Sequence, residues 1–155
     1  MYEATKISEL SNELTYHRYM LNQGQMGGLF KDITIPEYIA LHGLARSVGE
    51  NDGRAYLSDI ADELRLTVPQ TSKMIRGLRD RGLVSWSHDG DGSEGTYITV
   101  TESGLGLIER QEAVLKDYYR RVIEKFGAEN MIAFLNQMKS LEEIMDAELK
   151  EEDNG

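Results

Sequence analysis

The sequence contains no cysteine, no apolar run long enough to cross a membrane, and too few basic residues to balance its acidic ones. The lack of cysteine excludes disulfide scaffolds, thiolate zinc sites and cysteine nucleophiles, and it fits a reducing cytoplasm. No stretch reaches the roughly 18 apolar residues of a membrane span, and the beginning of the chain is too charged for a signal peptide. At 155 residues the chain has the length of one domain with its own core.

The shortage of basic residues gives a net charge of -10, from 17 basic and 27 acidic side chains. Such a chain as a whole repels the phosphates of nucleic acid. The charge is uneven, however, because residues 141–155 hold one lysine and seven acidic residues, a net charge of -6. Residues 67–82 have a net charge of +3, with one acidic side chain against Lys73, Arg76, Arg79 and Arg81. The acidic tail is typical of a solvated helix end or disordered tail, and the basic segment can still approach nucleic acid.

Apolar periodicity predicts helices at both ends of the chain. Residues 4–22 carry a stripe with steps of three and four: Ile7, Leu10, Leu14, His17 and Leu21. A long helix is expected from Ser103 to Phe126, and Gly127 should end it. The last helix has strict heptad spacing at Met131, Phe134, Met138, Leu141 and Met145. Two heptads are too few for a free coiled coil, so these patterns indicate helices that pack against other helices.

The middle of the chain carries several helix-start signals. Thr34 and Glu37 have the spacing of a capping box, and Ser58 is placed to cap a short helix with Ile60, Ala61 and Leu64 on its inner face. Thr67 and Gln70 form a second box, which predicts a helix through Arg81 that buries Thr71, Met74, Ile75 and Leu78. Gly82 supplies the left-handed stop.

Strand-forming residues follow this helix. Leu83–Ser87 and Thr96–Val100 favour strands, and the Gly- and Asp-rich segment between them indicates a hairpin with a long tip. Thr101 is placed to cap the next helix. We therefore expect a mainly α fold with a small β-hairpin (α+β). Two helices joined by a tight turn, the second of them basic, followed by a hairpin, make a winged helix-turn-helix candidate.

The residues of this segment resemble the MarR family of bacterial transcription regulators. The resemblance is carried by LSDIA at 57–61, LTVPQTSK at 66–73, LRDRGLV at 78–84 and ITVTESG at 98–104, and it extends to the flanking helices. It implies a single domain over residues 1–155, with a winged helix-turn-helix at about 34–101 flanked by dimerisation helices at about 4–22 and 103–150. It also implies a cytoplasmic, non-enzymatic homodimer that binds a pseudo-palindromic operator, as a repressor released by a small ligand.

Residues of the two helices of the helix-turn-helix, most of them at the start of the second helix, are then the DNA-contact candidates. They are Ser58, Thr67, Val68, Pro69, Gln70, Thr71, Ser72, Lys73, Arg76 and Arg79. Gln70 is suited to pair with adenine, and Lys73 or Arg76 to reach guanine or phosphate. Thr67 and the first backbone N–H groups can hold a phosphate. The alternative is that Arg76, Arg79 and Arg81 only form a solvated face.

The expected wing departs from the family, whose members carry an Asp-Arg-Arg-like tip. The matching positions here are Gly92, Ser93 and Glu94, with Asp89 and Asp91 nearby. Without arginines to bind phosphates at this tip, we expect weaker DNA binding than is typical of the family. A calcium loop is not indicated here, because the twelve-residue spacing to a terminal glutamate is missing.

The resemblance further implies a crevice for a small aromatic or phenolic acid. His17, Arg18, Tyr38 and His42 are the candidate ligand contacts, with satisfied core histidines as the alternative. A zinc site is not expected, because the three histidines have no metal-ligand spacing, and no cofactor is expected. No catalytic constellation is present, so an enzyme is not indicated. The remaining alternative is a winged-helix module that binds proteins and has lost DNA binding.

Overall fold

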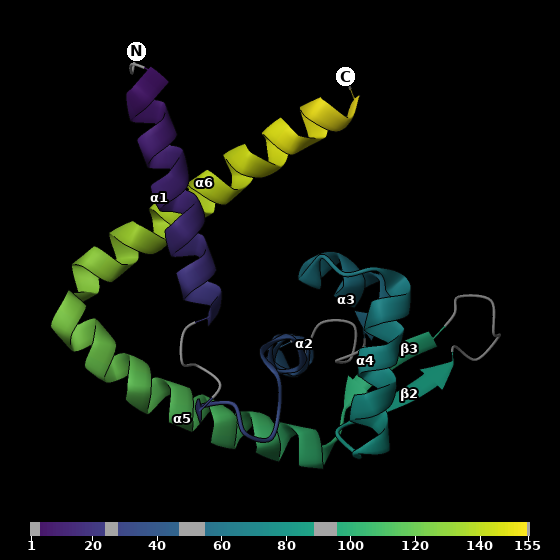
Figure 1. Ribbon diagram of the computed structural model, residues 1–155. Helices are drawn as coiled ribbons and strands as arrows, with labels where there is room; N and C mark the ends of the chain where they lie inside the picture. The colour runs from purple at the N-terminus through teal and green to yellow at the C-terminus, as the bar shows by residue number, and fades with distance from the viewer. Residues whose placement is uncertain (1–3, 24–27, 47–54, 89–95, 155) are drawn as a thin grey trace. The chain divides into compact units, whose positions relative to one another are not determined.

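The computed structural model describes residues 4–23, 28–46, 55–88 and 96–154, which form six helices and three strands (Figure 1). The chain divides into two compact units, Met1–Gln111 and Glu112–Gly155. This arrangement agrees with the predicted mainly α fold with a small sheet. Within the described residues, no helix is both long enough and apolar enough to cross a membrane.

The first unit contains the sheet and the helices that pack on it. Its elements are α1 (Ala4–Gln23), α2 (Ile35–Arg46), β1 (Ala55–Tyr56), α3 (Leu57–Leu64), α4 (Val68–Asp80), β2 (Val84–His88), β3 (Thr96–Val100) and the start of α5 (Glu102–Phe126). The strands form an antiparallel sheet in the order β1-β3-β2, with Trp86 opposite Ile98 and Ala55 opposite Ile98 on the other side. The two-residue strand β1 was not predicted, because it is too short to show a period-two pattern.

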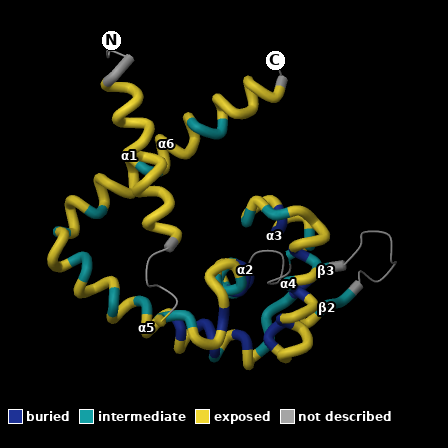
Figure 2. Tube along the Cα trace, viewed as in Figure 1, coloured by how far each residue is buried: buried dark blue, intermediate teal, exposed yellow. Residues whose placement is uncertain are grey.

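The core of this unit lies between α2, α3, α4, the sheet and the first turns of α5. Leu41, Leu44, Ile75, Leu78 and Ile98 are its most deeply buried apolar side chains. Figure 2 shows the buried positions gathered in these elements, whereas α1 is exposed along its described length. The apolar stripe predicted on α1 is therefore not covered within this chain.

Helix starts follow the predicted caps at three of the four expected places. At α2, the Thr34 N–H donates to Glu37 Oε1 (2.8 Å), and the Glu37 N–H donates to Thr34 Oγ1 (3.2 Å). At α5, the Gly104 N–H donates to Thr101 Oγ1 (3.1 Å). The prediction that Ser58 caps α3 was wrong. That helix begins two residues earlier, with Tyr56 as its N-cap, and the Tyr56 N–H donates to Asp59 Oδ2 (3.3 Å).

The turns between elements also follow local backbone preferences. Arg65 adopts a left-handed conformation (φ 57°) between α3 and α4, where the Leu66 N–H donates to the Ala61 carbonyl (3.0 Å). Gly82 takes the predicted left-handed stop after α4 (φ 77°). A single left-handed residue turns the chain at each of these places, at little cost for glycine and at a cost of about 1–2 kcal/mol for Arg65.

The second unit consists of the remainder of α5 and α6 (Ala128–Asn154). Gly127 separates the two helices with φ 99°, and the Asn130 side-chain amide donates to the Phe126 carbonyl (2.8 Å). The Phe126 and Phe134 rings pack edge to face with centroids 6.3 Å apart. Many other apolar side chains of α6 are exposed: Ile132, Leu135, Leu141, Ile144 and Leu149.

Candidate nucleic-acid interface

The candidate interface is built on α4, the second helix of the helix-turn-helix. Thr67 is its N-cap, and its Oγ1 accepts from the Gln70 N–H (3.2 Å) while the Thr67 N–H donates to Gln70 Oε1 (2.9 Å). Pro69 stands in the first turn, where its missing N–H costs no hydrogen bond. The predicted capping box is confirmed. The Gln70 oxygen is thus engaged in the cap, and the NH₂ group of the same amide takes no part in it.

The burial pattern of α4 divides its residues between the core and the outer face. Ile75 and Leu78 are fully buried, as predicted, and Met74 is half-buried. Val68, Pro69, Gln70, Lys73, Arg76 and Arg79 are exposed, as are Thr67 and Ser58, and Ser72 is half-buried. The exposed face therefore contains most of the predicted DNA-contact candidates.

Thr71 must be removed from the predicted DNA contacts. Its exposed fraction is 0%, and its hydroxyl donates to the Thr67 carbonyl (2.9 Å). The side chain points into the core and is satisfied there, so it cannot reach a base or a phosphate. The periodicity of α4 also predicted that Thr71 is buried, and the structure confirms that second prediction.

The outer face of α4 is electropositive because two of its basic side chains lack acidic partners. Within the described ranges, no carboxylate pairs with Lys73 or Arg76, and the Arg76 Nε donates only weakly to the Ser72 carbonyl (3.4 Å). Arg79 lies 3.5 Å from its neighbour Asp80 in an exposed pair. Positive charge without a local counterion is what a phosphate-binding surface needs.

Arg81 serves a different purpose from the other three basic residues. It extends from the C-terminal end of α4 to the start of α2, where its Nη1 lies 3.6 Å from Glu37 Oε1 and its Nη2 donates to the Asp32 carbonyl. Arg81 therefore ties the end of α4 to α2, a role that sequence spacing could not reveal because 49 residues separate it from Asp32.

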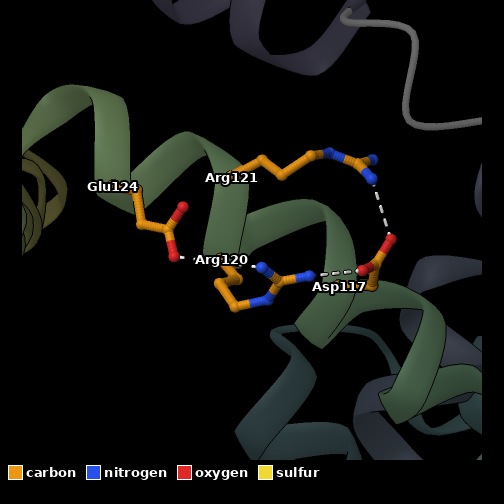
Figure 3. A network of polar contacts seen from close by, with 4 residues as sticks. All are labelled: Asp117, Arg120, Arg121 and Glu124. Atoms are coloured by element: carbon orange, nitrogen blue, oxygen red, sulfur yellow. Dashed lines mark hydrogen bonds and ion pairs between the residues drawn. The ribbon is translucent and has the colours of Figure 1, made fainter.

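The arginines of α5 show the contrasting arrangement. Arg120 Nη2 lies 2.8 Å from Asp117 Oδ1 and its Nη1 3.9 Å from Glu124 Oε1, and Arg121 Nη1 lies 2.9 Å from Asp117 Oδ2 (Figure 3). All four side chains are exposed and lie within one helix, so each pair contributes only about 0.3–0.5 kcal/mol. Their positive charge is locally compensated, unlike that of Lys73 and Arg76.

One contact of the interface was not predicted from the sequence. The Arg79 guanidinium lies over the Trp86 ring, 5.5 Å from its centroid. Trp86 shares a face of β2 with the buried Val84, and this period-two relation could have placed the ring against α4. The predicted acidic tip, with Asp89, Asp91, Gly92, Ser93 and Glu94, lies outside the described residues.

The predicted effector residues are only partly brought together. On α2, the Tyr38 and His42 rings have centroids 5.6 Å apart, and Phe30, not predicted, packs edge to face on Tyr38 at 5.9 Å. Phe30 also lines a cavity of about 440 Å³ together with Ile33, Ile35 and Arg81. His17 and Arg18 are exposed on α1, where the His17 ring contacts Tyr16 at 5.3 Å.

Neither histidine is a fully buried core residue: His42 is half-buried and His17 is exposed. Among the described residues, no group of three or more His, Cys, Asp or Glu side chains is arranged to hold a metal ion. Of the four predicted effector residues, Tyr38 and His42 are thus the two whose rings lie together, and Phe30 joins them in an aromatic cluster.

Solved structures share this arrangement of helices and hairpin over nearly the whole chain. A MarR family protein from Bacillus stearothermophilus is 22% identical, with a TM-score of 0.65, covering 94% of this chain and 99% of that one. The chain has the fold of MarR-family regulators. A mutant MarR from E. coli complexed with operator DNA shares this fold at 16% identity and a TM-score of 0.70, covering 83% of this chain and 93% of that one.

A third protein with the MarR fold is BpsR from Bordetella bronchiseptica, whose structure concerns regulation of its DNA binding by 6-hydroxynicotinic acid. It is 15% identical, with a TM-score of 0.67, covering 92% of this chain and 97% of that one. No family model matches the sequence, and no curated protein does. The resemblance noted in the sequence is therefore confirmed at the level of the MarR fold.

Proposed function

We propose that the protein is a sequence-specific DNA-binding transcriptional regulator, a repressor that binds a pseudo-palindromic operator. The observation that carries the proposal is the outer face of α4, where Lys73 and Arg76 are exposed, have no acidic partner among the described residues and follow an intact cap. The MarR fold supports it, since one protein with that fold was solved with operator DNA. Because its partner is DNA, we propose that the protein acts in the cytoplasm.

In this proposal α4 enters the major groove with its N-terminal half. Lys73 and Arg76 bind guanine or phosphate, and Val68, Pro69 and Ser72 contact base edges or the sugar-phosphate backbone. Gln70 reads adenine with its amide, whose oxygen also accepts the Thr67 N–H in the cap. Ser58 on α3 and the Val68 N–H at the start of α4 contact the backbone, since Pro69 has no N–H and those of Gln70 and Thr71 donate to Thr67.

We further propose that the protein acts as a homodimer. The support comes from apolar side chains that this single chain leaves exposed, on α1 (Ile7, Leu10 and Leu14) and on α6 (Ile132, Leu135 and Ile144). Extended exposed apolar faces are unusual in monomers. A two-fold dimer would place two α4 helices about 34 Å apart, which matches successive major grooves. Analytical ultracentrifugation of the purified chain tests this state.

The aromatic cluster on α2 supports the proposal of a small aromatic or phenolic effector that releases DNA. Phe30 and Tyr38 offer aromatic rings, and the His42 imidazole offers a hydrogen-bonding group for a carboxylate or phenol. A protein with the MarR fold whose DNA binding is regulated by a hydroxylated aromatic acid makes this class of ligand the one to try first.

A gel shift tests the central proposal and separates it from the protein-interaction alternative. The full chain is titrated against duplex DNA from upstream of its own gene and against a scrambled duplex of equal length. We expect binding that prefers the upstream duplex and is weaker for a Lys73→Ala, Arg76→Ala double variant. If neither duplex is bound at low salt, the protein is not a DNA-binding regulator, and the interaction-module alternative takes its place.

A further inference from the structure

Trp86 is the only tryptophan of the chain, and it stands on β2 beside the DNA-binding helix. It pairs across the sheet with Ile98, which is fully buried, and its own side chain is half-buried and packs against the core. The indole is therefore held in place by the sheet. The Arg79 guanidinium lies over its face, 5.5 Å from the ring centroid.

Arg79 lies one turn after Arg76 on the side of α4 that faces β2. Its neighbour Asp80 gives it little restraint, because that pair is 3.5 Å long and its side chains are 48% and 72% exposed. An arginine on an exposed helix surface normally moves among many rotamers. The ring of Trp86 is thus the group that fixes the direction of Arg79.

A ring beside a guanidinium leaves donors of Arg79 available. A guanidinium carries five N–H donors around the edge of its plane, so a single ring cannot engage all of them. A phosphate can therefore approach the remaining donors of Arg79 and accept up to two hydrogen bonds. Holding the side chain in advance lowers the entropy that binding costs.

The composition of the wing makes this side chain important. From Ser87 to Thr96 the sequence contains no lysine or arginine, but it contains Asp89, Asp91 and Glu94. The Arg79 guanidinium, which lies over Trp86 on β2, then brings a permanent positive charge from the adjacent helix to a described strand of the wing.

We propose that Trp86 is a positioning residue for DNA binding: it holds the Arg79 guanidinium at the wing side of α4, where that group binds a backbone phosphate. The wing thus contributes through an aromatic platform for a helix arginine instead of a basic tip. This inference rests on the proposed DNA-binding function and deepens it.

A double-mutant cycle tests the inference. Fluorescence anisotropy measures binding of the full chain to a labelled mixed-sequence duplex of about 30 base pairs, which is long enough for two half-sites. The variants are Arg79→Gln, Trp86→Leu and the two combined, each titrated at several salt concentrations. Lys73→Gln, alone and with Trp86→Leu, is the matched control, because it is Arg79 and not Lys73 that lies over the ring.

We expect Arg79→Gln to weaken binding about tenfold and to lower the salt slope by about one unit for each phosphate that is no longer bound. Trp86→Leu should weaken binding about two- to fivefold, and in its presence the effect of Arg79→Gln should shrink by that same two- to fivefold factor. The effect of Lys73→Gln should be the same in both backgrounds. A general disturbance of the fold by Trp86→Leu would change both effects.

Trp86→Phe keeps an aromatic face and should retain most of the binding. If circular dichroism shows Trp86→Leu to be unfolded, Trp86→Met, which also lacks a ring, takes its place in the cycle. If Arg79→Gln weakens DNA binding by the same factor with and without the Trp86 substitution of the cycle, the positioning role is overturned while DNA binding stands. If the wild-type protein binds no duplex at low salt, the proposed function falls, and this inference falls with it.

Discussion

Substituting Gly104 by alanine should destabilise the contact between the start of α5 and the turn that follows α4. Gly104 is buried in the first turn of α5, and a Cβ added there would lie 2.2 Å from the Leu83 carbonyl oxygen and 2.7 Å from Val100 Cγ2. The Leu83 oxygen is also the acceptor for the Thr101 N–H (3.1 Å). The Thr101 hydroxyl donates to the Gly82 carbonyl (2.6 Å), so the start of α5 is bound to the turn that joins α4 to β2.

The size of the effect follows from these contacts. A carbon ordinarily approaches a carbonyl oxygen no closer than about 3.3 Å, so the Gly104→Ala backbone must move by about 1 Å. Overpacking costs about 1–3 kcal/mol, and weakening the bond between Thr101 and Leu83 costs about 1 kcal/mol. The helix propensity of alanine returns about 1 kcal/mol. The net loss is about 1–3 kcal/mol in the free energy of unfolding. A loss of about 2 kcal/mol, the middle of this range, lowers Tm by about 4–8 °C.

Urea unfolding followed by Trp86 emission measures this loss, since the single tryptophan lies in the same unit as Gly104. Protomer concentration is kept constant, because dimerisation would change the apparent stability. The matched control is Gly77→Ala, in the interior of α4, where no atom lies within 4 Å of the added Cβ. It should raise stability by up to about 1 kcal/mol. Equal stability of the two variants would refute the close approach of α5 to the Leu83 carbonyl.

Three further predictions concern α4 and the effector cluster. Thr67→Ala should lower the free energy of unfolding by about 1 kcal/mol in urea titrations, whereas Thr67→Ser should keep the cap; equal losses would contradict the capping geometry. Lys73→Ala should lower the slope of log affinity against log salt by about one unit for each phosphate that is no longer bound. Lys116→Ala, at an exposed position of α5, should leave the slope unchanged. Identical slopes for the two variants would show that Lys73 binds no phosphate. His42→Ala should raise the concentration of 4-hydroxybenzoate needed to release DNA, and an unchanged release curve would remove His42 from the effector site.

Local signals in the sequence predicted most element boundaries because the interactions behind them are local. The boxes at Thr34 and Thr67 join groups three residues apart, so spacing alone specifies them. The left-handed stop at Gly82 depends on one residue's backbone freedom. The start of α3 was misplaced because Ser58 has the side chain of a common N-cap, whereas Tyr56 does not, and the carboxylate of Asp59 accepts from the Tyr56 N–H at the earlier start.

Residue type alone did not decide which candidates belong to the interface. Thr71 has the chemistry of a DNA contact, but helical periodicity and packing turn it into the core. Gln70 was expected to cap and to read adenine, and the structure shows its oxygen accepting the Thr67 N–H of the cap. These outcomes depend on which face of α4 is covered.

The sequence by itself determined the order of the helices and of the two hairpin strands, the caps at Thr34, Thr67 and Thr101 and the basic segment within an acidic chain, because each depends on neighbours a few residues apart. Only the tertiary structure decided that Arg81 ties α4 to α2 and that Trp86 holds Arg79. These contacts arise where α4 packs against other elements. Burial of the shared core decides which elements α4 packs against, and spacing along the chain does not predict that choice.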